Sequence, residues 1–237
     1  MTQDDFDIER LAVYLHLTPT QVSRMAERGR LPGRKISGQW RFSHAEIHHW
    51  LEERIGASDE QALVTVEDVL QRAEIPADGE PVSLSSMLPI ESIALPLTSR
   101  TRNSVIRDMV QLVAQTGLLW DPDKMVEAVR AREILHPTAL DNGVALLHPR
   151  RPLGSVLAEP LLALGRTYQG VPFGGARGSL TDVFFLICSV DDRGHLRVLA
   201  RLSRLIGVQD FLPTLRDVVT PEQAWQLIAD FEQQLPS

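Results

Sequence analysis

The sequence has very little cysteine and no long hydrophobic run. Its single cysteine, Cys188, has no partner for an intrachain disulfide, and its place in the apolar run DVFFLICSV indicates a small buried side chain. No apolar stretch approaches the roughly 20 residues of a membrane-spanning helix. The N-terminal MTQDDFDIER is acidic where a secretory signal is basic and then apolar. We therefore expect a cytoplasmic protein that does not bind membranes.

The sequence also lacks the spacing of a metal site. It contains seven histidines, but none stands with cysteines at a zinc-like interval. His48 and His49 are adjacent, so on a helix they would point to different sides and make a poor metal pair. We predict no metal site and no cofactor.

The net charge of the chain is negative, but one segment near the N-terminus is basic. The formal net charge is −7, yet residues 1–57 are neutral, with eight basic and eight acidic residues. Between Arg24 and Arg41, six basic residues stand against a single acidic one, Glu27. A local cluster of positive charge is the electrostatic signature of nucleic-acid binding, so the excess acid elsewhere does not exclude DNA as a partner.

The N-terminal 57 residues predict two short helices, a hairpin and a closing helix. Apolar residues recur with helical spacing from Ile8 to Leu15, and TPTQ at 18–21 supplies an N-cap, a first-turn proline and the glutamine of a capping box. Ser37-Gly38 predicts a hairpin turn, and Ser43 with Glu46 predicts a second capping box. Helices joined this tightly form a helix-turn-helix.

Residues 6–56 resemble the excisionase-type, MerR-like winged helix-turn-helix domain. The resemblance rests on LAVYLHLTPTQVSRMAERGRLP, the wing KISGQWRFS and the closing HAEIHHWLEE. It implies that the second helix enters the DNA major groove while the wing meets the backbone. The residues that would face the groove are Thr20, Gln21, Ser23 and Arg24, and those that would meet phosphates are Arg34, Lys35 and Arg41. The alternative is that these arginines form a solvated face, because some members of that family serve only in protein interaction or dimerisation.

The rest of the chain predicts a linker and an α/β domain. A length of 237 residues favours two domains, and the Pro/Gly/Asp-rich end of residues 58–81 is typical of a linker, with a short helix around Val66–Ala73. From residue 82 to 237, amphipathic segments alternate with the apolar runs GVALLH and TDVFFLICSV. Helices on both sides of a largely buried sheet make an α/β domain of about 150 residues.

His148 ends one of these apolar runs. A histidine at the end of a strand is more often a hydrogen-bonded structural residue than a catalytic one, although sites favour strand ends in α/β sheets. Its surroundings change that balance, because Arg132 precedes it by sixteen residues and a helix is expected to begin at His195. His136 matches no functional position and is interpreted as structural.

Residues 82–234 resemble the fructose/mannitol-type IIA component of the bacterial phosphoenolpyruvate-dependent sugar phosphotransferase system and its nitrogen-regulatory relatives. The motifs that carry the resemblance are VIRDMVQLVAQTG, the Arg132-Glu133 pair, Pro137-Thr138, NGVALLH, VPFGGARGSLTDVFFLI and HLRVLARLSRLI. The resemblance implies an α/β sandwich, the IIA type 2 fold, with a mixed sheet covered by helices.

The same resemblance assigns roles to individual residues. His148 would accept a phosphoryl group from the histidine phosphocarrier protein, since neutral imidazole is a competent nucleophile near pH 7. Arg132 and His195 would line the pocket and stabilise the transferred charge, while Asn142 and Thr138 would orient imidazole or phosphate. Two features depart from the family pattern Pro-His-Gly: this chain has Leu147-His148-Pro149, and Arg150 and Arg151 follow, which would hold phosphate or bind another anion.

Three functions remain open at this point. The first is a regulator in which the state of His148 modulates DNA binding. The second is a IIA phosphotransferase that serves a separate sugar permease, with the helix-turn-helix as a tether or dimerisation module. The third is a degenerate IIA fold that binds a small anion or a protein without phosphoryl transfer. A homodimer is the usual expectation for helix-turn-helix proteins.

Overall fold

The computed structural model divides the chain into two compact units, Met1–Pro81 and Val82–Ser237. It describes residues 5–15, 17–43, 46–47, 50–51, 82–175 and 178–235. The predicted linker and the helix expected around Val66–Ala73 lie outside these residues, so both stay predictions. Among the described helices, none is long and apolar enough to cross a membrane.

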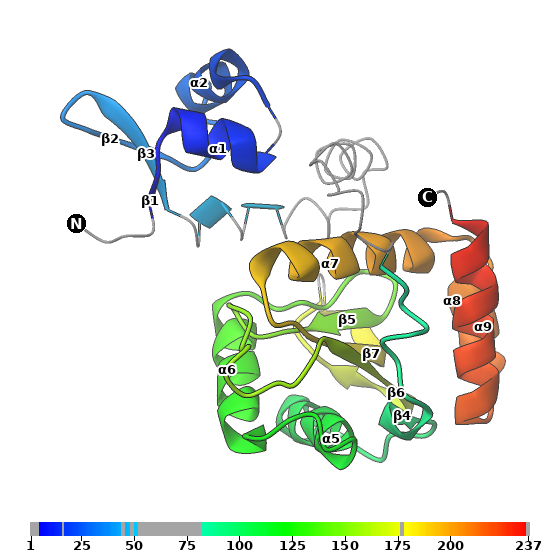
Figure 1. The fold of residues 1–237 in the computed structure, drawn as a ribbon. Helices are drawn as coiled ribbons and strands as arrows, with labels where there is room; N and C mark the ends of the chain where they lie inside the picture. The colour runs from blue at the N-terminus through cyan, green and yellow to red at the C-terminus, as the bar shows by residue number, and fades with distance from the viewer. Residues whose placement is uncertain are drawn as a thin grey trace. The chain divides into compact units, whose positions relative to one another are not determined.

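The first unit contains two helices and a small antiparallel sheet (Figure 1). Strand order is β1-β3-β2, and α1 packs against both α2 and β3. The elements are β1 (Asp5–Phe6), α1 (Ile8–Leu15), α2 (Pro19–Glu27), β2 (Arg34–Ile36) and β3 (Gln39–Ser43). The four described residues of the predicted closing helix, at 46, 47, 50 and 51, are helical, and the rest of that segment lies outside the described residues.

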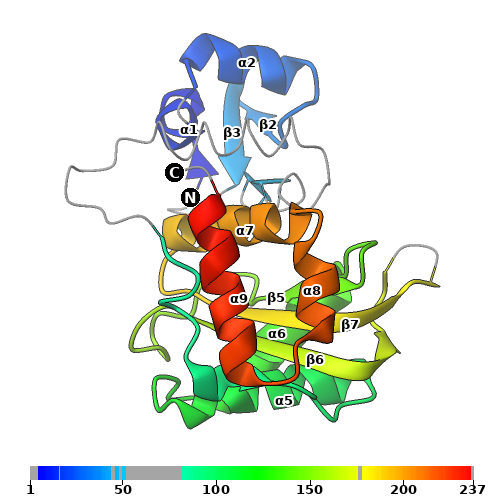
Figure 2. The same ribbon diagram turned by 90° about the vertical axis from the view of Figure 1, so that its right-hand side faces the viewer.

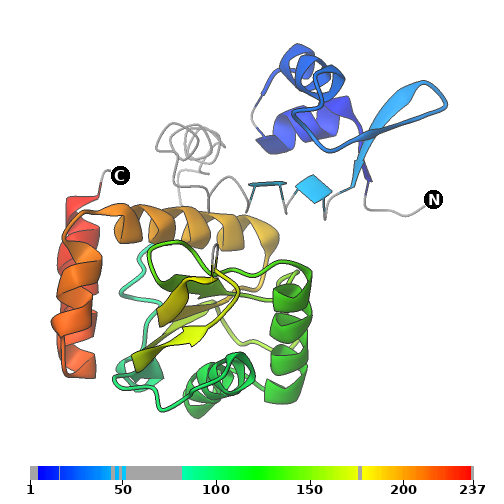
Figure 3. The same cartoon turned by 180° about the vertical axis from the view of Figure 1, so that it is seen from behind.

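Local sequence signals account for the ends of these elements. The Thr18 hydroxyl accepts from the Gln21 N–H at 3.2 Å, and the Gln21 side chain accepts from the Thr18 N–H at 2.8 Å, which confirms the predicted capping box. Ser37 and Gly38 have φ values of 50° and 80°, as a two-residue type I′ hairpin turn requires. The hairpin β2–β3 therefore forms where the sequence predicted the wing, and it projects from the two helices (Figure 3).

The second unit is a four-stranded mixed sheet covered by helices on both faces (Figure 2). Strand order is β4-β6-β7-β5, with β4–β6 and β5–β7 parallel and β6–β7 antiparallel. The strands are β4 (Ile93–Ala94), β5 (Val144–Leu147), β6 (Leu161–Pro172) and β7 (Leu180–Cys188). The helices are η1 (Ile90–Ser92), α5 (Arg102–Gln115), α6 (Pro122–Leu135), α7 (Asp192–Gly207), α8 (Phe211–Asp217) and α9 (Pro221–Gln234).

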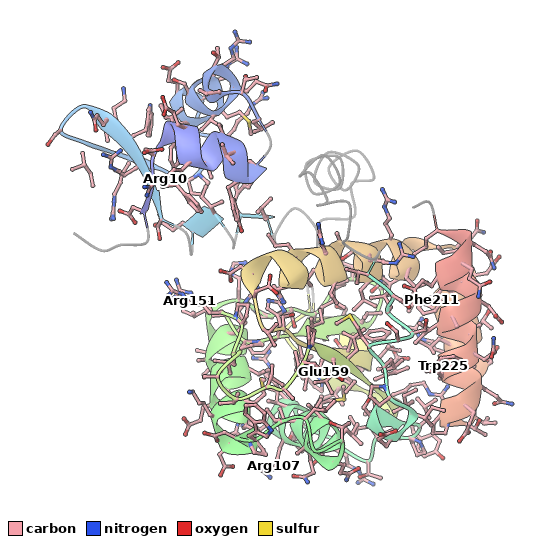
Figure 4. All side chains as sticks on the ribbon, viewed as in Figure 1. Arg10, Arg107, Arg151, Glu159, Phe211 and Trp225 are labelled. Atoms are coloured by element: carbon pink, nitrogen blue, oxygen red, sulfur yellow. The ribbon has the colours of Figure 1, made fainter. Side chains whose placement is uncertain are left out.

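Because side chains alternate along each strand, the buried residues of the sheet form two groups, one on each face of the sheet. Phe184, Leu186 and Cys188 of β7 join a buried cluster with residues of α5 and α6. The intervening residues, including Phe185 and Ile187, are also buried and face α7, α8 and α9 on the other side. Figure 4 shows side chains filling the space between the helices and the sheet. Burial raises the pKa of the Cys188 thiol to about 12, which fits a packed and unreactive side chain.

Candidate functional site

The candidate site forms where two parallel strands end. β5 and β7 are paired from Val144 with Val183 to Leu147 with Leu186, so their carboxyl ends lie at the same edge of the sheet. His148 follows β5 directly, and Ser189 follows β7 directly. Figures 1 and 3, drawn from opposite sides, both place α7 along the β5 side of the sheet. The site is therefore framed by two strand ends and one helix.

His148 is buried and fixed by the backbone. Its side chain continues the alternation of Val144 and Leu146, so it points to the α7 side of the sheet. Its residue exposure is 3%. The ring nitrogen Nδ1 lies 2.7 Å from the Leu146 carbonyl oxygen. A carbonyl oxygen only accepts hydrogen bonds, so Nδ1 carries the proton and Nε2 is the nitrogen with the lone pair.

His195 packs against His148. The two ring centroids are 4.9 Å apart with an interplanar angle of 50°, and His195 is 1% exposed. Its Nδ1 lies 3.2 Å from the Ser189 hydroxyl. The helix that carries it begins earlier than the sequence predicted: α7 starts at Asp192, after the N-cap Asp191, and His195 is its fourth residue. The Asp191 carboxylate caps this helix by accepting from the Gly194 N–H at 2.8 Å, which the sequence prediction missed.

The end of α6 supplies the third side of the site. Arg132 is 7% exposed, and its Nη1 donates to the His136 carbonyl oxygen at 2.7 Å. The chain then runs beside β5, with the Leu146 N–H donating to the Thr138 carbonyl oxygen at 3.3 Å. This pairing brings Thr138 and the end of α6 next to the strand that carries His148.

A buried carboxylate connects these residues. Glu133, 1% exposed, accepts hydrogen bonds from the Thr138 backbone N–H at 3.2 Å and from the Thr138 hydroxyl. Burial raises the pKa of Glu133, while the hydrogen bonds from Thr138 and the electrostatic interactions with His148 and Arg132 act to lower it. Glu133 thus lies within electrostatic reach of both basic residues. The sequence showed it only as part of the Arg-Glu pair.

Asn142 does not join the histidines, contrary to the expectation from the sequence. It lies six residues before His148, in the turn that precedes β5, whereas His148 follows the opposite end of that strand. There its Oδ1 accepts from the Val144 N–H at 3.3 Å, and its backbone oxygen accepts from Arg216 at 2.8 Å. The neighbouring Gly143 has a φ of 85°, and a Cβ at this position would lie 2.8 Å from Arg216 Nη2. Asn142 therefore shapes a tight turn far from the candidate acceptor.

The residues after His148 divide into one buried and two exposed positions. Pro149 is buried and offers no backbone N–H to an anion. Arg150 and Arg151 are exposed, and Figure 4 shows Arg151 at the periphery of the domain. Of the predicted site residues, His195 packs against the ring of His148. Arg132 and Thr138 lie at and just after the end of α6, beside β5, and Arg150 lies at the surface.

The residues predicted to contact DNA lie on α2 and on the wing of the first unit. On α2, Thr20, Gln21 and Arg24 are exposed, whereas Ser23 is half-buried. The Gln21 side chain is engaged in the capping box, and the Ser23 hydroxyl lies 3.4 Å from Glu27 Oε1. Arg24 is therefore the exposed cation that the recognition helix presents.

The wing presents its three cations on two faces. Arg34 and Arg41 are cross-strand partners, so they share one face of the hairpin, while Lys35 pairs with Trp40 on the other. Lys35 Nζ lies 5.2 Å from the centre of the Trp40 ring, and Arg34 forms an ion pair with Asp5 at 3.3 Å. Arg41 is half-buried, and it donates hydrogen bonds to the Trp40 carbonyl oxygen and to the Gln39 side chain. The prediction that Arg34, Lys35 and Arg41 all meet phosphates thus needs DNA contact with both faces of the wing.

Comparison with known proteins identifies the second unit. A family model described as phosphoenolpyruvate-dependent sugar phosphotransferase system, EIIA 2, matches residues 86–231. The chain belongs to this EIIA 2 family. A second model, described as a helix-turn-helix domain, matches residues 6–55. The chain thus joins a helix-turn-helix domain to an EIIA 2 domain, as the sequence motifs predicted.

Related proteins carry names from the phosphotransferase system and from nitrogen regulation. The chain is 29% identical over 127 residues to the fructose-specific EIIABC component of the phosphotransferase system from Bacillus subtilis, covering 53% of this chain but only 20% of that protein. It is 25% identical over 154 residues to the nitrogen regulatory protein of Pseudomonas aeruginosa, covering 62% of this chain and 98% of that protein.

The fold of the EIIA 2 domain is also that of solved structures. The nitrogen regulatory protein IIA-Ntr from Neisseria meningitidis superposes with a TM-score of 0.54 at 24% identity, covering 61% of this chain and 97% of that one. At this identity the likeness shows the fold alone. It agrees with the mixed sheet and its two helical layers.

Proposed function

We propose that His148 accepts a phosphoryl group from the phosphohistidine of the histidine phosphocarrier protein, and that its phosphorylation state modulates DNA binding by the helix-turn-helix domain. The observation that carries the first part is the hydrogen bond of His148 Nδ1 to the Leu146 carbonyl oxygen. It leaves Nε2 as a fixed nucleophile beside a second buried imidazole.

The transfer would be an in-line displacement at phosphorus. The lone pair of His148 Nε2 forms the new P–N bond, and the donor imidazole leaves with the electron pair of its own P–N bond. The proton of His148 stays on Nδ1 and keeps its hydrogen bond to the Leu146 carbonyl oxygen, which stabilises the positive charge that develops on the ring. His195 and Arg132 supply donors to the phosphoryl oxygens in place of the N–H that Pro149 lacks.

Phosphorylation can be tested directly on the full chain. Incubation with enzyme I, the phosphocarrier protein and phosphoenolpyruvate is expected to raise the intact mass by one phosphoryl group, in a form labile to acid. The control omits the phosphocarrier protein, and this sample should stay unmodified. An unmodified mass in the complete mixture would exclude phosphoryl acceptance and favour a IIA domain that binds an anion or a protein without chemistry.

DNA binding is supported by the basic surface of the first unit, and α2 presents Arg24 on that surface. We expect Arg24→Gln to weaken binding to a random-sequence duplex and to lower the slope of log affinity against log salt by about 1, as the loss of one phosphate contact does. Arg107→Gln is the matched control, because Arg107 is an exposed arginine of the EIIA 2 domain. Equal salt slopes for the two variants would argue against contact between α2 and DNA.

Coupling between the two domains needs a separate measurement. Adding a phosphoryl group places about −1.5 to −2 charges at the His148 site, enough to change a charged interface. We expect the DNA affinity of the wild-type protein to change on phosphorylation, and that of His148→Gln to stay constant under the same treatment. Identical affinities for the phosphorylated and unphosphorylated wild type would favour a plain IIA component with the helix-turn-helix as a tether.

A further inference from the structure

Ser189 contacts the second histidine of the site from the end of β7. It is 2% exposed, and its hydroxyl lies 3.2 Å from Nδ1 of His195. Its own backbone oxygen accepts from the Leu153 N–H at 3.2 Å, which holds the strand end in place. The two hydrogen-bonding groups are therefore buried together at the edge where β5 and β7 end.

The backbone of His195 is fixed as firmly as its side chain. Its N–H donates to the Asp191 carbonyl oxygen at 3.1 Å in the first turn of α7, and the Asp191 carboxylate caps the same turn. The imidazole can therefore keep its packing against His148 while Ser189 contacts Nδ1. In such a setting, the proton position on the ring is set by the partner of Nδ1.

Resting on the function proposed above, we infer that Ser189 is a positioning residue for phosphoryl transfer. Its hydroxyl donates to Nδ1 of His195 and holds that ring as the Nε2–H tautomer. The Nε2–H then donates to an oxygen of the phosphoryl group on His148. No bond of the transfer is made or broken at Ser189, which acts only through His195.

The chemistry of the two rings determines the direction of this hydrogen bond. A hydroxyl can donate or accept, so the distance alone allows both tautomers of His195. The phosphoryl oxygens are negatively charged and accept hydrogen bonds, so the ring beside them must present an N–H. His148 contributes no such donor, because its Nδ1–H is hydrogen-bonded to the Leu146 carbonyl oxygen and its Nε2 bonds to phosphorus. A Ser189 hydroxyl that donates to Nδ1 is the arrangement that provides one from a neutral His195.

The first arm of the test measures the tautomer itself in the unphosphorylated full-length protein. Nitrogen-15 chemical shifts of His195 at neutral pH are expected to show the Nε2–H tautomer in the wild type and a shift toward the Nδ1–H form in Ser189→Ala. Ser189→Thr keeps the hydroxyl and should restore the wild-type shifts. Unchanged His195 shifts in Ser189→Ala would overturn the inference. This arm needs no phosphoryl transfer, so it decides the role of Ser189 even if wild-type His148 takes up no phosphate.

The second arm measures transfer from the phosphorylated phosphocarrier protein. We expect Ser189→Ala to lower the maximal transfer rate about tenfold, the size of one net hydrogen bond, with little change in the half-saturating donor concentration. Ser203→Ala is the matched control: Ser203 is a buried serine of α7 whose hydroxyl has no hydrogen-bond partner within the described part of the chain. A Ser189→Ala rate no lower than that of Ser203→Ala would contradict the inference.

A double-mutant comparison separates action through His195 from a general packing effect. In a His195→Ala background, adding Ser189→Ala should cause no further loss of rate, because the group that Ser189 orients is already gone. A further tenfold loss in that background would show that Ser189 acts by another route, and the inference would fail.

Discussion

His148→Gln is expected to abolish phosphoryl uptake completely. Glutamine has a similar polar character but no imidazole nitrogen, so no P–N bond can form and the intact mass should stay unchanged after incubation with the complete phosphotransfer mixture. The loss should exceed that of any other single substitution at the site, because Arg132 and His195 only stabilise charge.

The control for this experiment is His136→Gln. His136 is the exposed C-cap residue of α6, and its carbonyl oxygen accepts a hydrogen bond from Arg132 Nη1. The substitution keeps that carbonyl, so His136→Gln should be phosphorylated like the wild type. If His148→Gln still gained an acid-labile phosphoryl group, His148 would not be the acceptor.

Glu232→Gln is expected to lower the free energy of unfolding by about 3 kcal/mol, the usual cost of breaking a buried, charge-assisted hydrogen-bond network. Glu232 of α9 is 5% exposed and accepts from the Leu84 N–H at 2.6 Å, the Ser85 N–H at 3.0 Å and Arg201 Nε at 2.8 Å. Glutamine would lose the charge and present an N–H to one of these donors. Urea denaturation of the full chain followed by tryptophan fluorescence would measure the change.

The pH dependence of this effect provides an independent check. Burial alone would raise the pKa of Glu232, but hydrogen bonds from Arg201, Leu84 and Ser85 outweigh it and hold the pKa below the ordinary 4.5. The stabilisation is therefore present above pH 4.5 and is lost as the pH falls through the lower, folded-state pKa. The difference in the free energy of unfolding between the wild type and Glu232→Gln should therefore become smaller in acid. Glu159→Gln is the control, because it replaces an exposed carboxylate. Its free energy of unfolding should equal that of the wild type at neutral pH and in acid.

The sequence predicted the elements whose ends carry strong local signals. Thr220 with Gln223 forms the capping box of α9, Asp121 caps α6, and the apolar run that ends at Cys188 became β7. It missed β6, since Gly165 and Gly170 interrupt its apolar pattern, and a register shift follows Arg166. It also missed α8, which is short and contains Pro213.

The candidate site was predicted in part, because residue types indicate chemistry but not which strand end a residue occupies. His148, His195, Arg132 and Thr138 were named from the resemblance. In the structure, His195 packs against the ring of His148, and Thr138 pairs with β5 through its carbonyl oxygen. Asn142 was named from the same resemblance, but it lies beyond the opposite end of β5. Ser189 went unnoticed, although a polar residue at the end of a buried strand is a usable signal for a site at that edge.

The pairing of residues 138–140 with β5 also determines how a partner can approach. β5 lies at one edge of the four-stranded sheet, where exposed N–H and carbonyl groups would invite another chain to add a strand. The Leu140 N–H donates to the Val144 carbonyl oxygen at 2.7 Å, and Ala139 forms a bridge with Ala145, so this border is already occupied. On the function proposed above, a phosphoryl donor would reach His148 end-on, past the tips of β5 and β7, rather than by joining the sheet.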